Sequence, residues 1–156
     1  MGTPNPEHIK KLSELINRSA FPALISMQLT DIGVGFATFE LETEEKHMQL
    51  RGVVHGGVIA SLIDTVAFWA VYYGIEDPEA WLTSVDLKLN YLAPATAGKL
   101  IARGRQIKIG RRLCYSDAEV FHADGRLVAH GASTLLVIRN DWPGRHGPFP
   151  PKFIET

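Results

Sequence analysis

The sequence predicts an α+β fold in which an antiparallel β-sheet wraps around one long helix. Three observations lead to this prediction. Residues 55–74 are apolar nearly all round, which is typical of a helix surrounded by protein. After Pro78 the chain alternates between apolar and polar residues, with the period of two that marks a strand. The later strands follow one another through short turns, so they should be antiparallel neighbours in a sheet with its helix on one face.

Length and composition indicate one globular domain. The chain has 156 residues, of which 46% are hydrophobic and 21% charged, and its formal net charge is -1. We expect a single domain over 1–156, with a core at about 27–139, an N-terminal helix at about 6–20 and an irregular tail at 140–156. The balanced charge disfavours nucleic acid as a partner.

Cysteine usage and the N-terminal residues bear on the compartment. Cys114 is the single cysteine of the sequence, so no disulfide forms within the chain and a reducing compartment is expected. No apolar run follows the first basic residues, and the apolar stretch 58–75 carries Asp64, which is costly at the centre of a membrane helix. We therefore expect a cytoplasmic protein that does not insert into membranes.

The first elements are a helix and two short strands. Apolar residues fall at helical spacing over 6–20, and Pro22 is expected to end that helix. Residues 27–43 alternate like a strand, and Gly33 and Gly35 predict a turn or bulge within them. Residues 44–54 are expected to form a loop.

The later elements are the apolar helix, which begins at Gly56 and Gly57 and ends at Gly74, and four long strands. The first strand ends at Pro94, and the others are expected at about 99–109, 112–121 and 126–138. Asp124-Gly125 predicts a two-residue hairpin turn before the last strand. The first strand is predicted to have an apolar face and a polar face: Val85, Leu87, Leu89 and Tyr91, against Ser84, Asp86, Lys88 and Asn90.

Asp64 is the first candidate for chemistry, because it lies in the middle of the apolar helix. Burying a carboxylate costs several kcal/mol, so a sequence keeps one there for a reason. Such an Asp is either a general base or nucleophile with a protonation state tuned by burial, or a structural residue that bonds Ser61 or a nearby loop. The residue alone favours neither.

The start of the same helix, His55-Gly56-Gly57, is the second candidate. Free backbone N–H groups and the positive end of the helix dipole can bind an oxyanion, and glycine lets a ligand come close to the backbone. The alternative is a plain glycine-rich helix start with a structural His55. Asp64, nine residues after His55, favours the first interpretation, since it adds a carboxylate about two and a half turns further along.

Two further groups of residues are weaker candidates. A hydroxyl at Thr83-Ser84 can orient a water, although a solvated strand face is the favoured interpretation. Seven basic residues and no acidic one lie between Leu87 and Ser116, which leaves 9 basic against 17 acidic residues elsewhere. A basic segment can hold a phosphorylated ligand, or it can be a set of solvated strand edges. We favour the ligand for Arg111 and Arg112, which follow the turn at Gly110, and the solvated edge for Lys99 and Lys108.

No metal site is expected, because the histidines have no ligand spacing among them and Cys114 stands alone. The alternation around Cys114 places it in the core rather than at a reactive position.

Three stretches together resemble a known family: residues 51–65 (RGVVHGGVIASLIDT), residues 83–95 (TSVDLKLNYLAPA), and Gly98 with Gly110-Arg-Arg. They are similar to the hot dog fold acyl-CoA thioesterases of the PaaI type, in the 4-hydroxybenzoyl-CoA thioesterase superfamily. The likeness covers roughly residues 30–138. It implies hydrolysis of a small-molecule acyl-CoA thioester to a free acid and CoA, with no cofactor beyond the CoA of the substrate. It also implies a homodimer whose sheets join, commonly paired into a homotetramer, with active sites at the subunit interface.

The resemblance assigns roles to particular residues. Asp64 matches the carboxylate that activates water or attacks the thioester carbonyl, and the Gly57 N–H matches the oxyanion donor. Gln49 falls where the family has an Asn or Gln that polarises the carbonyl, and Ser84 where some members orient the attacking water. In this family Asp64 acts across the interface, on a thioester held by Gln49 and Gly57 of the other subunit.

Other positions are implied more loosely. His55 matches a family histidine with a chiefly structural role. The positions implied for binding the substrate or its CoA phosphates are Gly56, Thr83, Arg111 and Arg112.

Two other functions stay open: a hot dog enoyl-CoA hydratase or dehydratase, and a non-catalytic acyl-CoA-binding protein. The first needs a catalytic His apart from His55 with a separate acid, and the second would lack the carboxylate of Asp64. The acyl group is not predicted, because the aromatic residues of the helix suit either an acyl pocket or the core. They are Phe68, Trp69, Tyr72 and Tyr73.

Overall fold

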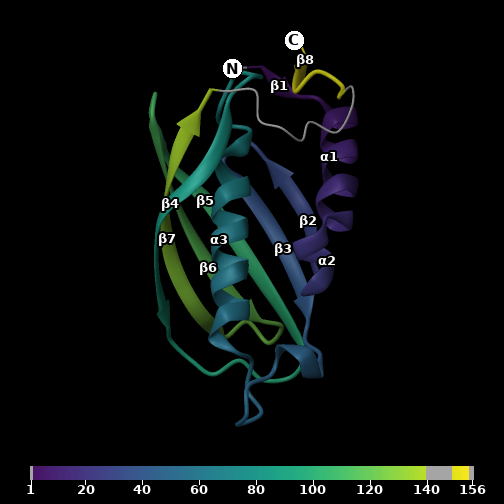
Figure 1. Ribbon diagram of the computed structural model, residues 1–156, viewed down its shortest axis with the longest axis vertical. Helices are drawn as coiled ribbons and strands as arrows, with labels where there is room; N and C mark the ends of the chain where they lie inside the picture. The colour runs from purple at the N-terminus through teal and green to yellow at the C-terminus, as the bar shows by residue number, and fades with distance from the viewer. Residues whose placement is uncertain (1, 140–148, 155–156) are drawn as a thin grey trace.

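A computed structural model describes residues 2–139 and 149–154. Six strands form one antiparallel sheet in the order β2-β3-β5-β6-β7-β4, and the long helix α3 lies against its concave face (Figure 1). The predicted α+β class, the hot dog arrangement of a sheet wrapped around a central helix, is confirmed. The elements are β1 (Thr3–Pro4), α1 (Pro6–Arg18), α2 (Ala20–Leu24), β2 (Met27–Gly33), β3 (Phe36–Glu42), the 3-10 turn η1 (Glu45–His47), α3 (Gly56–Tyr72), β4 (Trp81–Tyr91), β5 (Lys99–Ile109), β6 (Leu113–His122), β7 (Leu127–Ile138) and β8 (Phe153–Ile154).

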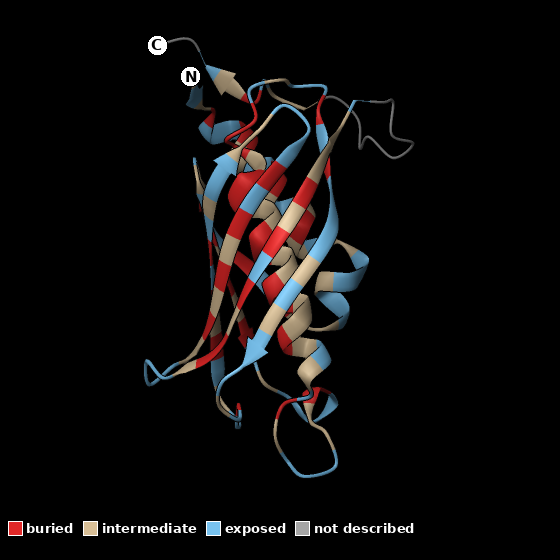
Figure 2. Cartoon of the chain, turned by 90° about the vertical axis from the view of Figure 1, so that its left-hand side faces the viewer, coloured by how far each residue is buried: buried red, intermediate tan, exposed pale blue. Residues whose placement is uncertain are grey.

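The helix α3 lies close to the sheet because two strand positions lack a side chain. A Cβ on Gly104 of β5 would lie 2.3 Å from the carbonyl oxygen of Val66, and one on Gly131 of β7 would lie 2.6 Å from Ile63. Only glycine fits at these contacts, which fix the distance between helix and sheet. The face of α3 that contacts the sheet is buried, as the red segments of this helix show (Figure 2).

One face of α3 is only partly covered, unlike the prediction of a helix surrounded on all sides. The residues on this open face are only half-buried, because the sheet of a single chain reaches around the opposite side of the helix. They are Ser61, Asp64, Thr65, Phe68, Trp69 and Tyr72. A helix that is apolar all round but open on one face indicates that a further surface covers it.

A β-bulge in β4 changes which residues face the helix. The register with β7 shifts between Ser84 and Asp86, so that Val85 is the extra residue and is 53% exposed. Leu87 and Leu89 pack against the core, and Ser84 now shares their face. The predicted grouping of Val85 with Leu87, and of Ser84 with Asp86, is therefore wrong, because a bulge reverses the alternation of side chains. Ser84 is nevertheless exposed in this chain, as predicted.

Two predicted turns also differ from the structure. Pro22 does not end the first helix: the chain becomes extended at Ser19 instead, and Pro22 lies in the first turn of α2, where its missing N–H is not needed. The hairpin at Asp124-Gly125 has three loop residues rather than two, since His122 N–H donates to Arg126 O. The carboxylate of Asp124 accepts from Arg126 N–H, and Gly125 adopts a φ of 87°, which together favour the longer loop.

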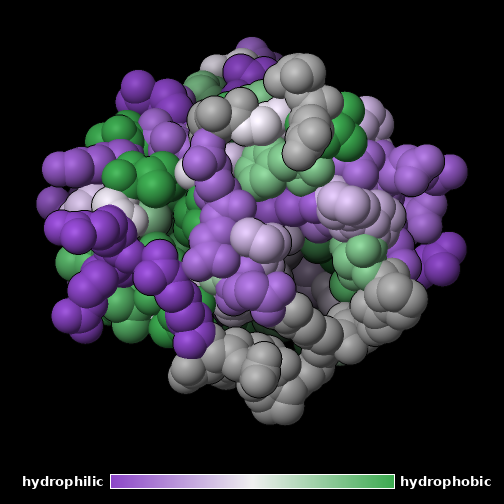
Figure 3. Space-filling model, turned by 90° about the horizontal axis from the view of Figure 1, so that it is seen from above, coloured by the Kyte–Doolittle hydropathy of each residue, from purple (hydrophilic) through white to green (hydrophobic). Residues whose placement is uncertain are grey.

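The two ends of the described chain meet beyond the C-terminal end of α3. Thr3 and Pro4 of β1 pair with Ile154 and Phe153 of β8. Figure 3 views the molecule from this end and shows hydrophobic side chains between hydrophilic ones. Part of the predicted irregular tail, residues 140–148, lies outside the described residues.

The C-terminal segment caps α3 with a buried lysine. The Lys152 ammonium donates to the carbonyl oxygens of Tyr72 and Ile75 and lies 3.9 Å from the centre of the Tyr72 ring. From α1, the buried His8 Nδ1 forms a 2.8 Å hydrogen bond with the Tyr73 hydroxyl. Within the part of the chain that the structure describes, no helix is both long and apolar enough to span a bilayer.

Candidate active site

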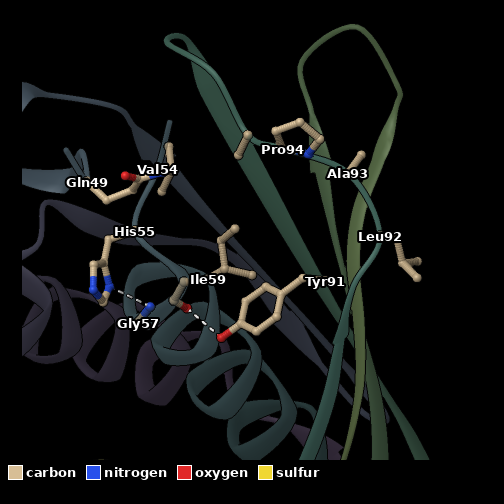
Figure 4. A pocket seen from close by; sticks show the side chains of 11 residues that line it. Gln49, Val54, His55, Gly57, Ile59, Tyr91, Leu92, Ala93 and Pro94 are labelled. Atoms are coloured by element: carbon tan, nitrogen blue, oxygen red, sulfur yellow. Dashed lines mark hydrogen bonds between the residues drawn. The ribbon is translucent and has the colours of Figure 1, made fainter. Parts of the chain in front are cut away.

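The N-terminus of α3 is shaped by His55, which is its N-cap. The chain is extended at His55, with φ −61° and ψ 134°, and its Nδ1 accepts a hydrogen bond of 2.9 Å from the Gly57 N–H (Figure 4). The Tyr91 hydroxyl donates to the Gly56 carbonyl at 3.0 Å. A Cβ on Gly56 would lie 3.0 Å from that hydroxyl. Glycine at this position therefore allows the end of β4 to close against the start of the helix.

The sequence suggested that the Gly57 N–H is free. In the structure it is not, because it donates to the His55 imidazole. A ligand that takes this donor must displace His55 Nδ1. The His55 side chain is exposed, so a change of rotamer can release the N–H without disturbing the core. The helix start is thus an oxyanion site that is capped by its own side chain.

An open pocket of about 530 Å³ lies between this helix start and the segment that follows β4. We call it the β4 pocket; it is lined by Gln49, Val54, His55, Gly56, Gly57, Ile59, Tyr91, Leu92, Ala93, Pro94 and Ala95. The Gln49 Oε1 accepts from the Arg51 N–H at 2.7 Å, which directs the amide hydrogens of Gln49 to other acceptors. The structure brings four predicted site residues together here: Gln49, His55, Gly56 and Gly57.

A second pocket of about 280 Å³ lies on the other side of His55, and the sequence did not predict it. We call it the α2 pocket; it is lined by Phe21, Ile25, Lys46, Met48, His55, Gly57, Val58 and Ser61. These residues come from α2, the region around η1 and the start of α3, so no single motif contains them. Only the structure shows that Phe21 and Leu24, two apolar residues of α2, are exposed beside this pocket.

Asp64 and Ser84 form the other cluster of predicted residues. The Ser84 hydroxyl donates to Asp64 Oδ1 at 2.8 Å, so Ser84 lies on the side of β4 that faces the helix. Ser61 is not the partner of Asp64, because its hydroxyl donates to the Gly57 carbonyl at 2.8 Å. The sequence suggested a buried carboxylate at Asp64. In the structure Asp64 is only half-buried on the open face of α3, so a single chain does not enclose it.

The two clusters are too far apart within one chain to act on one carbonyl. Gly57 and Asp64 are seven residues apart on α3, which is about 10 Å along the helix axis. A base must lie within hydrogen-bond reach of its water, directly or through one more water. One chain therefore presents two halves of a site: a donor half (Gln49, His55, Gly56, Gly57) and a base half (Asp64, Ser84).

Three predicted binding residues lie away from both halves. Thr83 is exposed, next to Ser84 along the strand and so on the opposite face of β4. Arg111 and Arg112 are exposed in the turn between β5 and β6, near the C-terminal end of α3, where a Cβ on Gly74 would lie 3.0 Å from Ile109. The donor half lies at the other end of the helix, so one chain does not bring these arginines to it.

Other reactive groups do not form a site among residues 2–139 and 149–154. No group of three or more His, Cys, Asp and Glu side chains in these ranges is arranged to hold a metal ion. Cys114 is buried in the core as predicted, and burial raises the pKa of its thiol. A buried, protonated thiol is a poor nucleophile.

Comparison with known proteins gives a consistent picture. Residues 51–129 match the family model described as the thioesterase superfamily. A Caenorhabditis elegans protein that carries an esterase name is 31% identical over 107 residues, or 67% of this chain and 62% of the relative, somewhat under two thirds of its length. Human acyl-coenzyme A thioesterase 13 is 29% identical over 108 residues, or 68% of this chain and 76% of the relative. The crystal structure of a Haemophilus influenzae thioesterase shares the fold, with a TM-score of 0.79 over 94% of this chain and 99% of that one, at 24% identity.

Proposed function

The chain belongs to the thioesterase superfamily, and we propose that it hydrolyses an acyl-CoA thioester to a free acid and CoA. Thioester hydrolysis is the chemistry of the family, and an acyl-CoA substrate is supported by the similarity to human acyl-coenzyme A thioesterase 13. One observation carries the proposal: the same helix bears an oxyanion site between two pockets and a carboxylate paired with a serine hydroxyl.

In the proposed reaction, the donor half stabilises the negative charge that develops on the thioester oxygen. The carbonyl oxygen replaces His55 Nδ1 at the Gly57 N–H, and the positive end of the α3 dipole adds to the attraction. The amide hydrogens of Gln49 are the second donor. Loss of one such donor typically lowers kcat about 100- to 1000-fold.

The base half supplies the attacking water. Asp64 takes a proton from the water as its oxygen bonds to the carbonyl carbon, and the Ser84 hydroxyl holds the carboxylate in place. As the tetrahedral intermediate collapses, the C–S bond breaks and the CoA sulfur takes the proton back from Asp64. The mechanism needs neither a metal nor a redox cofactor.

Attack by Asp64 itself, through an acyl anhydride, would use the same geometry. A single turnover in ¹⁸O-water tests for this route. In the general-base route the first acid released carries the label and Asp64 does not. Label on Asp64 would show an anhydride that water opens at the Asp64 carboxyl carbon.

We further propose that the working unit is a homodimer, alone or as half of a homotetramer, in which each site takes one half from each chain. The strand β4 has 11 residues and lies at the edge of the sheet. Such a long edge presents unpaired backbone groups to another strand. Pairing with a second copy would continue the sheet, cover the open face of α3, and bring Asp64 of one chain to Gly57 of the other. Arg111 and Arg112 are proposed to reach the CoA phosphates only in such an assembly.

The test is release of free thiol from a panel of acyl-CoA esters by the purified protein. Asp64→Asn should lower the rate at least about 100-fold, which is the typical size of a general-base contribution, with an unchanged circular dichroism spectrum. Full activity of Asp64→Ala would contradict the mechanism. A decrease of enoyl-CoA ultraviolet absorbance without thiol release would instead identify a hydratase.

A further inference from the structure

Both pockets end at the same donor. His55 and Gly57 line the β4 pocket and the α2 pocket alike, so the two cavities meet at the N–H that would bind the thioester oxygen. A thioester carbonyl carries two arms, an acyl group and a thiol arm that leads to the nucleotide. Two pockets that meet at one oxyanion site match this branched shape, with one arm in each.

The lining of the α2 pocket is suited to an apolar arm. Phe21, Ile25, Met48 and Val58 form its walls, and three of these also pack against the core: Ile25, Met48 and Val58. Its polar side chains already have partners. Lys46 Nζ donates to Ser26 at 2.6 Å and lies 3.2 Å from Glu44, and Ser61 donates to Gly57 O. The pocket therefore offers few groups to the amides of a thiol arm.

The β4 pocket is suited to the other arm. It is nearly twice as large, and it contains the Gln49 amide and the backbone that follows β4, although the Tyr91 hydroxyl already donates to the Gly56 carbonyl. The pantetheine arm of CoA carries two amides, which bind best where donors and acceptors are at hand. This pocket also lies beside the β4 edge, where the proposed partner chain would enclose the arm.

The helix α2 presents apolar surface that nothing among the described residues covers. It contains no buried residue, and Phe21 is 50% exposed although it forms a wall of the α2 pocket. An apolar side chain exposed on the rim of a pocket indicates a surface that a ligand buries.

We propose that the α2 pocket binds the acyl group and the β4 pocket the pantetheine arm, so that Phe21, Met48 and Val58 set the acyl specificity. This inference rests on the proposed function. The substrate class that fits is an apolar acyl group longer than acetyl, which can use the apolar walls of this pocket.

The test is kcat/KM for straight-chain acyl-CoA esters from acetyl to palmitoyl, with wild type and matched variants. Wild type should prefer octanoyl-CoA to acetyl-CoA by at least about tenfold in kcat/KM. This is a low estimate, because a single buried methylene can already change kcat/KM by about tenfold. Phe21→Ala should lower that preference about tenfold, chiefly by slowing octanoyl-CoA, because it removes one wall. Met48→Trp should shift the optimum to shorter chains by filling the pocket.

Two controls isolate the effect. Leu24→Ala, on the same helix but outside both pockets and 68% exposed, should leave the profile unchanged. Leu92→Trp, in the β4 pocket, should slow all chain lengths by a similar factor.

The outcomes separate this inference from the proposed function. If wild type releases thiol from no acyl-CoA, the proposed function fails and the inference fails with it. If wild type is active but Leu92→Trp shifts the chain-length optimum and Phe21→Ala does not, the acyl group lies in the β4 pocket and the inference alone is overturned. It is also overturned if Phe21→Ala changes the oligomer mass with no change in the profile, because α2 is then a subunit contact.

Discussion

Ser84 shares a face of β4 with residues that the alternation assigns to the opposite face. Ser84 lies on the same face of β4 as the buried Leu82, and its hydroxyl donates to Asp64 Oδ1 at 2.8 Å. The extra residue Val85 then lets Leu87 and Leu89 return to this face, so that Ser84 shares it with them. The sequence identified Ser84 and Asp64 by resemblance, but the pattern of apolar and polar residues grouped Ser84 with the wrong neighbours.

Replacement of Ser84 tests this contact. Ser84→Ala should lower kcat about 10- to 100-fold with little change in KM, because a hydrogen bond to a charged group contributes about 1.5–3 kcal/mol. Ser84→Thr keeps the hydroxyl and should retain most of the activity. Steady-state kinetics on one acyl-CoA ester measures both, and equal losses in the two variants would contradict the role of the hydroxyl.

At the scale of elements, the bounds of the strands were more predictable than the irregularities within them. The strand at 99–109 has the predicted bounds and ends before Gly110, but its register with β6 shifts between Gln106 and Lys108, which the sequence did not predict. The bulge at Val85 and the three-residue loop before β7 depend on pairing with a neighbouring strand, which a single segment does not encode. The α2 pocket was missed for the same reason, since three separate segments form it. The donor half was found because its residues are close in sequence.

The edge strand β4 gives a prediction about assembly. Val85→Asp places a second acidic side chain beside Asp86 on this edge, so two copies should repel each other where β4 would pair with β4. We expect monomers and a loss of activity greater than tenfold, while the circular dichroism spectrum stays the same. Light scattering and thiol release measure the two effects. Val34→Asp, in the turn between β2 and β3, is the matched control and should change neither; an active Val85→Asp monomer would refute the shared site.

At the scale of the whole molecule, the division of the site between chains can be tested by complementation. Asp64→Asn lacks the base and Gln49→Ala lacks a donor, but a dimer with one chain of each kind has one intact site. Refolding an equal mixture should therefore restore about a quarter of wild-type activity, because about half of the dimers are mixed and each has one good site. Either variant refolded alone is the control. No recovery would mean that both halves act within one chain.

The packing of the terminal segments on α3 predicts a pH dependence of stability. Burial, assisted by Lys152, lowers the pKa of His8 from 6.5 to about 4. Between these values the unfolded chain binds a proton that the folded chain does not, so the His8 penalty is absent above pH 6.5 and stability decreases as the pH falls from 6.5 toward 4. Burial also lowers the pKa of Lys152 from 10.5 to about 8, so its contribution improves as the pH rises from 8 toward 10.5.

Thermal unfolding at a series of pH values measures these effects. Wild type should lose Tm steadily from pH 6.5 to 4. His8→Phe cannot titrate and should show a flatter slope there, even if its Tm at neutral pH is lower because the hydrogen bond to Tyr73 is lost. Parallel slopes for the two proteins would show that His8 is not the titrating group.

The cap at the start of α3 makes His55 a tethered competitor of the substrate. The imidazole is attached next to the Gly57 N–H, so its effective concentration at this donor does not depend on the substrate. The fraction of molecules in which the N–H is released is therefore the same for every substrate. The apparent affinity for any thioester is reduced by that fraction, and the factor is the same for every acyl group. Discrimination between acyl groups therefore arises outside the cap, in the two pockets that meet there. Release of the cap by itself should therefore change the apparent affinity for all substrates by one common factor.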